Sequence, residues 1–198
     1  MTDRLPETSA HANPDELWVV RHGETEWSAT GRHTSTTDVA LTTAGEEAAC
    51  ALGARLAGTS FDLVLTSPRE RARRTAVLAG YPHAQVDDDL AEWSYGDYEG
   101  VTTSTIRQTV PGWTVWTHPS PGGESAADVG RRLDRVVAKV RAHGGRVLVF
   151  GHGHASRVLA ARWLDQPVAE GRFFRLDTAT ISVLGYERES PVVARWNS

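Results

Sequence analysis

The sequence predicts an α/β fold built around a parallel sheet, and three of its strands are recognisable as short apolar runs. A continuous apolar run that ends in a polar turn is typical of a strand buried on both faces, as parallel sheets require. The three runs are Leu17–Val20, Phe61–Thr66 and Arg146–Phe150. A segment with helical spacing of apolar residues follows each of them, which is the alternation expected of an α/β domain.

The length of the chain, 198 residues, suits one domain with a sizeable core, which we place at residues 16–198. Residues 1–15 are polar, contain Pro6 and Pro14 and lack an apolar segment. We therefore expect them to form a flexible N-terminal tail rather than a signal peptide.

Composition and charge exclude several classes of partner. The net charge of -4 argues against nucleic acid and leaves no basic face for a membrane surface. No apolar run approaches the length of a membrane span. The single cysteine, Cys50, rules out an internal disulfide and favours a cytoplasmic location.

A helix is predicted after Thr42 or Thr43, and Glu46 would complete a capping box with Thr43. Its apolar face consists of Ala44, Ala48, Leu52 and Leu56. Cys50 lies in this helix and is expected to be packed and unreactive. A nucleophilic cysteine loop would require an arginine six residues later, where Leu56 stands.

A second helix begins near Ser67 and Pro68, which suit the N-cap and first helical positions. Four arginines lie near its start, at positions 69, 71, 73 and 74. Arg71 shares a side with Thr75 and Leu78, so it is the arginine expected to point at the sheet.

The segment Val86–Leu90 is interpreted as a weak strand that ends in acidic residues. Asp87 and Asp89 form an Asp-x-Asp pair, which we interpret as solvated acids because no long apolar strand precedes it. The next carboxylates, Glu92, Asp97 and Glu99, stand among aromatic residues, where desolvation can raise a carboxyl pKa. Each could serve as a general acid on chemical grounds alone. Two further aromatics, Trp113 and Trp116, could form a lid or pocket wall, or simply cover the core.

The remaining elements have clear signals. Ser125 and Asp128 cap a long helix that Gly144 and Gly145 end. The apolar face of this helix is formed by Val129, Leu133, Val136, Val137 and Val140. The segment Phe173–Trp196 is interpreted as strands with a turn near Glu189, Ser190 and Pro191.

Two of the buried strands end in a histidine followed by glycine. His22 follows Arg21, and His152 belongs to the run Gly151-His152-Gly153-His154. Since the carboxyl ends of parallel strands meet at one edge of the sheet, the histidines should lie together and bind an anion there. The simpler alternative is a hydrogen-bonded histidine at each strand end. His152 and His154 could also be metal ligands, although the cations of Arg21 and Arg71 would repel a divalent ion.

The motifs at these strand ends resemble those of the histidine phosphatase superfamily, the phosphoglycerate mutase-like fold. They are Arg21-His22-Gly23-Glu24-Thr25-Glu26-Trp27, Thr66-Ser67-Pro68 with Arg71-Ala72 and Thr75, Glu92 with Gly100, and His152-Gly153. The resemblance covers about residues 17–187. It implies a three-layer sandwich in which a mostly parallel sheet carries helices on both faces.

The resemblance also implies the catalytic roles. His22 would be the phosphorylated nucleophile, and Arg21, Arg71 and a protonated His152 would bind the phosphoryl group. Glu92 would be the proton donor. We further expect the tautomer of His22 to be fixed by a hydrogen bond at its second ring nitrogen.

Finer features resemble the sedoheptulose bisphosphatase-like branch. They are Trp27-Ser28, Thr37-Asp38, the run from Glu92 to Gly100, and His152-Gly153-His154-Ala155 with Arg157. Ser28, Thr34 and Gly153 are therefore candidate substrate-binding residues, and Arg157 is a candidate for a second anionic group. Ser28 stands where many relatives have asparagine, and Ser35 where a glycine often follows Thr34.

The function that follows is a phosphatase that needs no cofactor or metal and acts on a small phosphomonoester, with a sugar phosphate or bisphosphate as the leading class. The alternatives are mutase-type phosphoryl transfer and a non-catalytic phosphate-binding module. A homodimer is left open.

Overall fold

The computed structural model describes residues 15–198, which form one six-stranded sheet in the order β3-β2-β4-β1-β5-β6. The strands are β1 (Glu16–Arg21), β2 (Leu63–Thr66), β3 (Gln85–Val86), β4 (Arg146–Gly151), β5 (Ile181–Glu187) and β6 (Ser190–Arg195). The first four strands of that order pair in parallel, and β5 and β6 are added antiparallel beside β1. The predicted tail, 1–15, lies outside the described residues except for Asp15, whose carboxylate accepts a hydrogen bond from Gly145 N.

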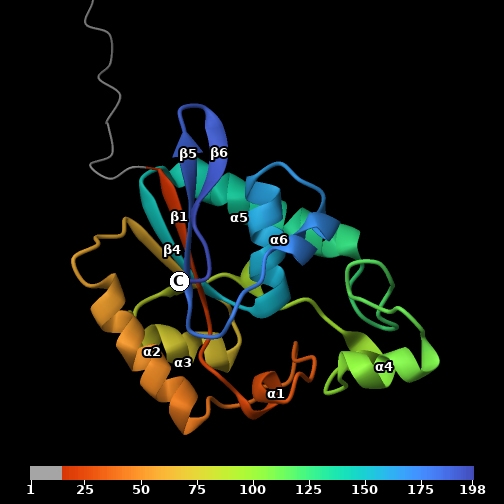
Figure 1. Ribbon diagram of the computed structural model, residues 1–198. Helices are drawn as coiled ribbons and strands as arrows, with labels where there is room; N and C mark the ends of the chain where they lie inside the picture. The colour runs from red at the N-terminus through yellow and green to blue at the C-terminus, as the bar shows by residue number, and fades with distance from the viewer. Residues whose placement is uncertain (1–14) are drawn as a thin grey trace, which may run out of the picture.

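Six α-helices lie around this sheet in the described part of the chain (Figure 1). They are α1 (Glu26–Ala29), α2 (Thr43–Leu56), α3 (Glu70–Leu78), α4 (Thr103–Thr109), α5 (Ala126–His143) and α6 (Gly153–Trp163). Short 3-10 turns are η1 (Asp88–Leu90), η2 (Gly96–Tyr98) and η3 (Val168–Phe173). Helices α2 and α3 cover one face of the sheet, and α5 and α6 cover the other. The predicted three-layer sandwich is thus confirmed.

Alternation along the buried strands divides the core between the two faces. In β4, Val147 and Val149 pack with α5 and α6, whereas Leu148 and Phe150 pack with α2 and α3. All four side chains are fully buried, as expected for a strand covered on both sides. No helix between residues 15 and 198 is long and apolar enough to span a membrane.

The pairing of β1 with β4 brings the two histidines to the same edge of the sheet. The strands are parallel neighbours in a register that sets Arg21 opposite Gly151. His22 N also donates to the carbonyl of Gly151 at 3.0 Å, which extends the pairing by one residue. The residue that follows each strand is therefore a histidine at the same edge, as predicted.

Of the two predicted N-caps of α2 the first is correct, and the predicted apolar face is correct at Leu52 and Leu56 but shifted by one position in the first half of the helix. Thr42 is the N-cap, with its side chain accepting from Gly45 N, so the capping box of Thr43 and Glu46 is absent. The buried positions are Gly45, Ala49, Leu52 and Leu56, whereas Ala44 and Ala48 are exposed. Cys50, expected to be packed, is exposed as well. Alanines at many positions of this helix leave little contrast between its faces.

The start of α3 also differs from the prediction. Arg69 is its N-cap and makes no side-chain capping bond, while Ser67 hydrogen-bonds His152. Ser67 Oγ still accepts a local bond from Arg69 N at 3.2 Å, so its contact with His152 is an addition to the local bond, and the helix itself begins two residues later than predicted. The inward position of Arg71 is confirmed, since only 1% of this residue is exposed.

The acidic run after β3 is less solvated than expected. Asp87 is buried and pairs with Lys139, and Asp89 pairs with Arg135. These ion pairs fasten η1 to α5. The capping box of Ser125 and Asp128 at the start of α5 is present as predicted.

The register of α2 can be tested by enlarging neighbouring alanines. Ala49→Leu inserts atoms into a closed core and should lower the free energy of unfolding by about 1–3 kcal/mol. Ala48→Leu, on the exposed side, should change it by less than about 0.5 kcal/mol. Urea denaturation followed by circular dichroism measures both values. A larger loss of unfolding free energy for Ala48→Leu than for Ala49→Leu would instead support the apolar face predicted from the sequence.

Candidate active site

His22 and His152 face each other at the end of β1 and β4, with ring centroids 5.3 Å apart. His22 Nδ1 lies 2.7 Å from the carbonyl of Gly23. Because a carbonyl only accepts, Nδ1 carries the proton, and a neutral ring then has its lone pair on Nε2. The predicted hydrogen bond that fixes the tautomer of His22 is therefore present, and Nε2 is the nitrogen available for nucleophilic attack.

Two arginines beside His22 use their terminal nitrogens to bind backbone carbonyls. Arg21 Nη1 donates to the carbonyl of Leu176 at 2.5 Å, and the Nη atoms of Arg71 donate to carbonyls of residues 34–37. The Nε atoms of both arginines are buried and have no hydrogen-bond partner within residues 15–198. Neither arginine makes an ion pair in this part of the chain, so each keeps its charge and one N–H for an anion.

His152 supplies a third such donor. Its Nε2 lies 2.6 Å from Ser67 Oγ, and Ser67 Oγ already accepts a bond from Arg69 N. The Ser67 hydroxyl can donate its proton to Nε2, and in that tautomer neutral His152 carries its ring proton on Nδ1. This Nδ1 is buried and has no partner in the described chain.

Burial keeps both histidines neutral. The pKa of His22 is held well below its ordinary value by burial first and then by the charges of Arg21 and Arg71. The pKa of His152 is lowered in the same way by burial, by Arg71 and by His22. The predicted protonated His152 concerns the site with a phosphoryl group bound and stays a prediction; burial and the neighbouring charges by themselves favour a neutral His152 that offers a hydrogen bond. A phosphoryl dianion beside it would oppose that shift.

The turn after His22 is fixed by close contact with α2. A Cβ on Gly23 would lie 2.4 Å from the carbonyl oxygen of Gly45, so no side chain fits between the two backbones. Gly23 N donates to Thr75 Oγ1 at 3.0 Å. Glycine is needed here because the backbone of α2 approaches the turn so closely. A bridge between Thr25 and Leu41 closes the segment that follows.

The carboxylate of Glu92 is held by three backbone N–H groups. Oε1 accepts from Trp93 N and Ala155 N, both at 2.8 Å, and Oε2 accepts from His154 N at 3.0 Å. Two of these donors belong to the first turn of α6. Oε2 lies 3.6 Å from the position that a Cβ on Gly153 would occupy, on the side of the Arg21 guanidinium. It keeps one lone pair and is the oxygen placed to carry a proton.

The other two carboxylates near Glu92 have different surroundings. Asp97 is exposed, and Glu99 accepts hydrogen bonds from the backbone of Ser35 and Thr37. The structure therefore brings only Glu92, of these three, to the histidines.

A cavity of about 240 Å³ opens in front of His22. It is lined by Arg21, His22, Ser28, Thr34, Glu92, Gly153 and Arg157, which were predicted from the sequence, and by Gly31, Arg32, His33, Tyr95, Thr103, His154 and Leu176. Arg71 and His152 lie buried beneath this lining. The cavity is smaller than the roughly 300–1,000 Å³ of pockets for drug-sized ligands, which indicates a small substrate.

Arg157 is held in the cavity wall. Its Nε and Nη2 donate to the carbonyls of Gly171 and Arg172, both at 3.0 Å, and its guanidinium stacks over Trp116 at 4.7 Å from the ring centroid. Trp116 therefore supports the wall, and Trp113 is a core residue, 1% exposed. The two N–H groups of Nη1 and the second N–H of Nη2 are left for a second anionic group.

Sequence reasoning missed the polar aromatic part of the lining. The Tyr95 hydroxyl lies 2.6 Å from His154 Nδ1, and the ring of His33 lies 4.7 Å from that of Tyr95. Burial lowers the pKa of His33 to about 4, and burial followed by Arg157 lowers that of His154. These groups are neutral at pH 7. Only the His-Gly-His motif could have drawn attention to His154, and it suggested a metal instead.

Nothing in residues 15–198 adds support to the hypothesis that His152 and His154 bind a metal ion. No group of three or more histidine, cysteine, aspartate or glutamate side chains in residues 15–198 could hold a metal ion. His152 and His154 make their hydrogen bonds to different partners, Ser67 and Tyr95.

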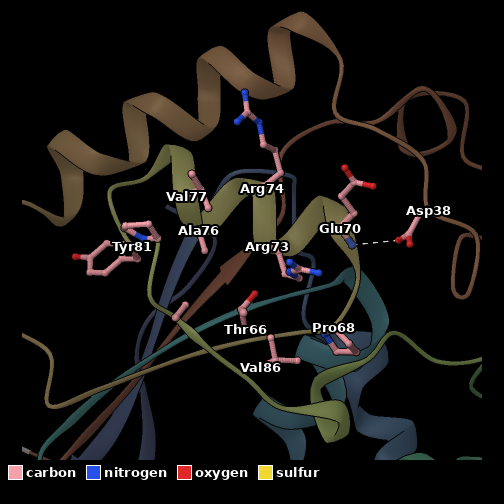
Figure 2. Close-up of a pocket in the computed structure, with 12 residues that line it drawn as sticks. Asp38, Thr66, Pro68, Glu70, Arg73, Arg74, Ala76, Val77, Tyr81 and Val86 are labelled. Carbon is pink, nitrogen blue, oxygen red and sulfur yellow. Dashed lines mark hydrogen bonds between the residues drawn. The ribbon is translucent and has the colours of Figure 1, made fainter.

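A larger cavity, about 460 Å³, lies on the outer side of α3 (Figure 2). Its lining includes Arg73, Arg74, Tyr81 and Val86, and Asp38 at its rim accepts a bond from Glu70 N at 3.1 Å. Its lining contains neither His22 nor His152, neither Arg21 nor Arg71, and not Glu92. The candidate chemistry therefore belongs to the smaller cavity.

Known proteins resemble this chain over most of its length. An acid phosphatase of Mycobacterium tuberculosis is 46% identical over 175 residues, which cover 86% of each chain. Sedoheptulose 1,7-bisphosphatase of Saccharomyces cerevisiae is 37% identical over 178 residues, which cover 73% of this chain and 66% of the yeast enzyme. The solved structure of an open reading frame product of Mycobacterium tuberculosis superimposes with a TM-score of 0.89 at 44% identity, covering 92% of this chain and 96% of that one.

The family model described as histidine phosphatase superfamily (branch 1) matches residues 17–198, which include every motif quoted above. The site geometry fits this match, because Arg21, Arg71 and His152 lie near His22 and each has a buried nitrogen without a partner within the described chain, as Arg69 also has. The chain therefore belongs to the histidine phosphatase superfamily.

Proposed function

We propose that this phosphatase hydrolyses small phosphomonoesters through a phosphohistidine on His22, without a metal ion. The observation that carries the proposal is the set of partnerless buried nitrogens, Arg21 Nε, Arg71 Nε and His152 Nδ1, on side chains that surround His22. Three N–H donors suit the equatorial oxygens of a transferring phosphoryl group. Their preorganisation, more than bond-making by the protein, is what phosphoryl transfer requires.

In the first step, His22 Nε2 attacks phosphorus and the bond between phosphorus and the leaving-group oxygen breaks. The electron pair of that bond stays on the leaving oxygen, which takes a proton from Glu92 Oε2. Arg21 and Arg71 neutralise the charge on the phosphoryl oxygens throughout.

In the second step, water attacks the phosphorus of phosphohistidine. Glu92, now a carboxylate, accepts the proton of this water, and the pair of the phosphorus–nitrogen bond returns to Nε2. Inorganic phosphate leaves, and Glu92 is again protonated for the next cycle.

We propose a sugar phosphate or bisphosphate as the substrate class. The part of the cavity beyond the phosphoryl site presents neutral donors and acceptors from His33, Thr103 and His154, which suit the hydroxyl groups of a polyol. A second phosphate would reach Arg157 Nη1 or the exposed Arg32.

His22→Ala should reduce phosphatase activity to that of a control without enzyme, because the proposed covalent intermediate forms on this side chain. Wild-type protein quenched in acid-free conditions during turnover should carry an acid-labile phosphate on His22, measurable by mass spectrometry. His83→Ala, which changes an exposed histidine outside the site, is the matched control and should behave as wild type. Full activity of His22→Ala would exclude the covalent mechanism.

Glu92→Gln should slow phosphorylation by a sugar phosphate about 10²–10⁴-fold, since the leaving alkoxide needs a proton. Phosphorylation by p-nitrophenyl phosphate should lose much less, because nitrophenolate leaves without one. Single-turnover kinetics separate this step from dephosphorylation, which also uses Glu92. Asp97→Asn is the control and should match wild type. Equal losses with both substrates would remove Glu92 from the role of acid.

The substrate class is tested with a panel of sugar monophosphates, bisphosphates and phosphoglycerates. Inorganic phosphate should appear in step with substrate loss, and the sugar esters should give the highest kcat/KM. Isomerised phosphoglycerate with little free phosphate would instead identify a mutase. Binding of these esters without turnover would identify a phosphate-binding module.

A further inference from the structure

The three carbonyls that hold Arg71 come from one short loop. Arg71 Nη1 donates to the carbonyl of Thr37 at 3.1 Å, and Nη2 donates to those of Thr34 and Ser35 at 3.1 and 3.2 Å. These bonds fix the plane of the guanidinium and so set the direction of its free Nε. Because the acceptors are neutral, they orient Arg71 without cancelling its charge.

The loop that provides these carbonyls, residues 34–37, has no helix or strand of its own. The carboxylate of Glu99 binds its other side. Glu99 Oε1 accepts from Ser35 N at 2.9 Å and from Thr37 N at 3.0 Å, and Oε2 accepts from Ser35 N at 3.0 Å and from Ser35 Oγ. Ser35 and Thr37 thus give their N–H groups to Glu99 and their carbonyls to Arg71.

The environment of Glu99 fits an ionised side chain with a fixed geometry. Burial alone would raise its pKa, but the hydrogen bonds from Ser35 and Thr37 outweigh burial and hold the pKa of Glu99 below its ordinary value. The neighbouring backbone strengthens the contact, since His33 N donates to the carbonyl of Val101 at 3.0 Å and Gly100 N to that of His33 at 2.8 Å.

We propose that Glu99 is a positioning residue for phosphoryl binding, which acts on Arg71 through the loop 34–37. The proposal rests on the proposed function, because it takes Arg71 as a ligand of the phosphoryl group. Glu99 does not line the cavity and donates no proton in the reaction. Its carboxylate accepts hydrogen bonds from the N–H groups of Ser35 and Thr37. The carbonyls of the same two residues accept hydrogen bonds from the guanidinium of Arg71.

Glu99→Gln is the sharpest variant because it preserves the size of the side chain. The amide oxygen can replace only one carboxylate oxygen, and the amide nitrogen would face an N–H donor that it cannot accept. The loop should therefore shift and take the guanidinium of Arg71 with it. Hydrogen bonds to charged groups have energies that correspond to about a tenfold loss or more in binding.

The experiment measures orthovanadate binding by calorimetry and kcat/KM with p-nitrophenyl phosphate and a sugar phosphate, using the full chain. Glu99→Gln should weaken vanadate about tenfold and lower kcat/KM by a similar factor for both substrates. This independence of the leaving group separates Glu99 from Glu92. The matched control is Asp97→Asn, an exposed carboxylate two positions away, and it should stay within about twofold of wild type.

A double-mutant cycle with Arg71→Ala distinguishes positioning from a general structural role. In the Arg71→Ala background, Glu99→Gln should change kcat/KM by less than about twofold, because its effect passes through the missing guanidinium. The same loss in both backgrounds, or no loss in wild type, would overturn the proposal. If Glu99→Gln does not fold by circular dichroism, Ser35→Ala, which removes one contact to Glu99, enters the same cycle.

The two proposals fail in different ways. Wild-type protein that neither binds vanadate nor hydrolyses p-nitrophenyl phosphate would contradict the proposed function. Wild-type protein that does both, together with an additive cycle, would contradict only the role of Glu99.

Discussion

The parallel pairing of β1 with β4 is the constraint on which the site depends. A one-residue slip in this register would turn one histidine to the opposite face of the sheet and separate the two rings. The bond from His22 N to the carbonyl of Gly151 fixes the register at the edge where the site lies. Apolar side chains on both faces of β1 and β4 then stabilise this register, because each strand buries side chains on both sides. The core of the protein therefore determines the distance between the two histidines of the proposed phosphoryl site.

Within residues 15–198, Arg21 and Arg71 bring positive charge to the site without forming an ion pair. Burying a guanidinium is costly unless it is hydrogen-bonded, and Arg21 and Arg71 meet that requirement with backbone carbonyls instead of carboxylates. Burial first, and then these two charges, lower the pKa of His22, which keeps the proposed nucleophile neutral. The same field attracts the phosphoryl dianion. One electrostatic arrangement thus prepares both partners of the reaction.

Much of this arrangement follows from local sequence patterns, and the rest depends on contacts between distant segments. Apolar runs predicted β1 and β4, and the capping box of Ser125 predicted the start of α5. The predicted N-cap, Ser67, lies two positions before the actual one, and local pattern gave no sign that its hydroxyl also contacts His152, 85 positions away. Tyr95 and His154 likewise meet only through the fold. In α2 the failure was different, since its many alanines gave a weak periodic signal and the first half of the predicted apolar face was shifted by one residue.

The segment between Thr25 and Leu41, which follows the turn at Gly23, has a consequence for how the cavity can vary among related proteins. The chain leaves the nucleophile turn at Thr25, returns at Leu41, and is fastened again where Thr42 N donates to the carbonyl of Glu24 at 2.9 Å. Its two ends therefore lie side by side, whatever the chain does between them. Lengthening such a closed excursion costs little entropy, about 0.6 kcal/mol for each doubling. Its outer part, Ser28–Arg32, borders the cavity without holding Arg71. The fold thus allows residues 28–32 at the edge of the cavity to change. Such changes would alter which leaving groups fit the cavity, while His22 and the side chains around it keep their positions.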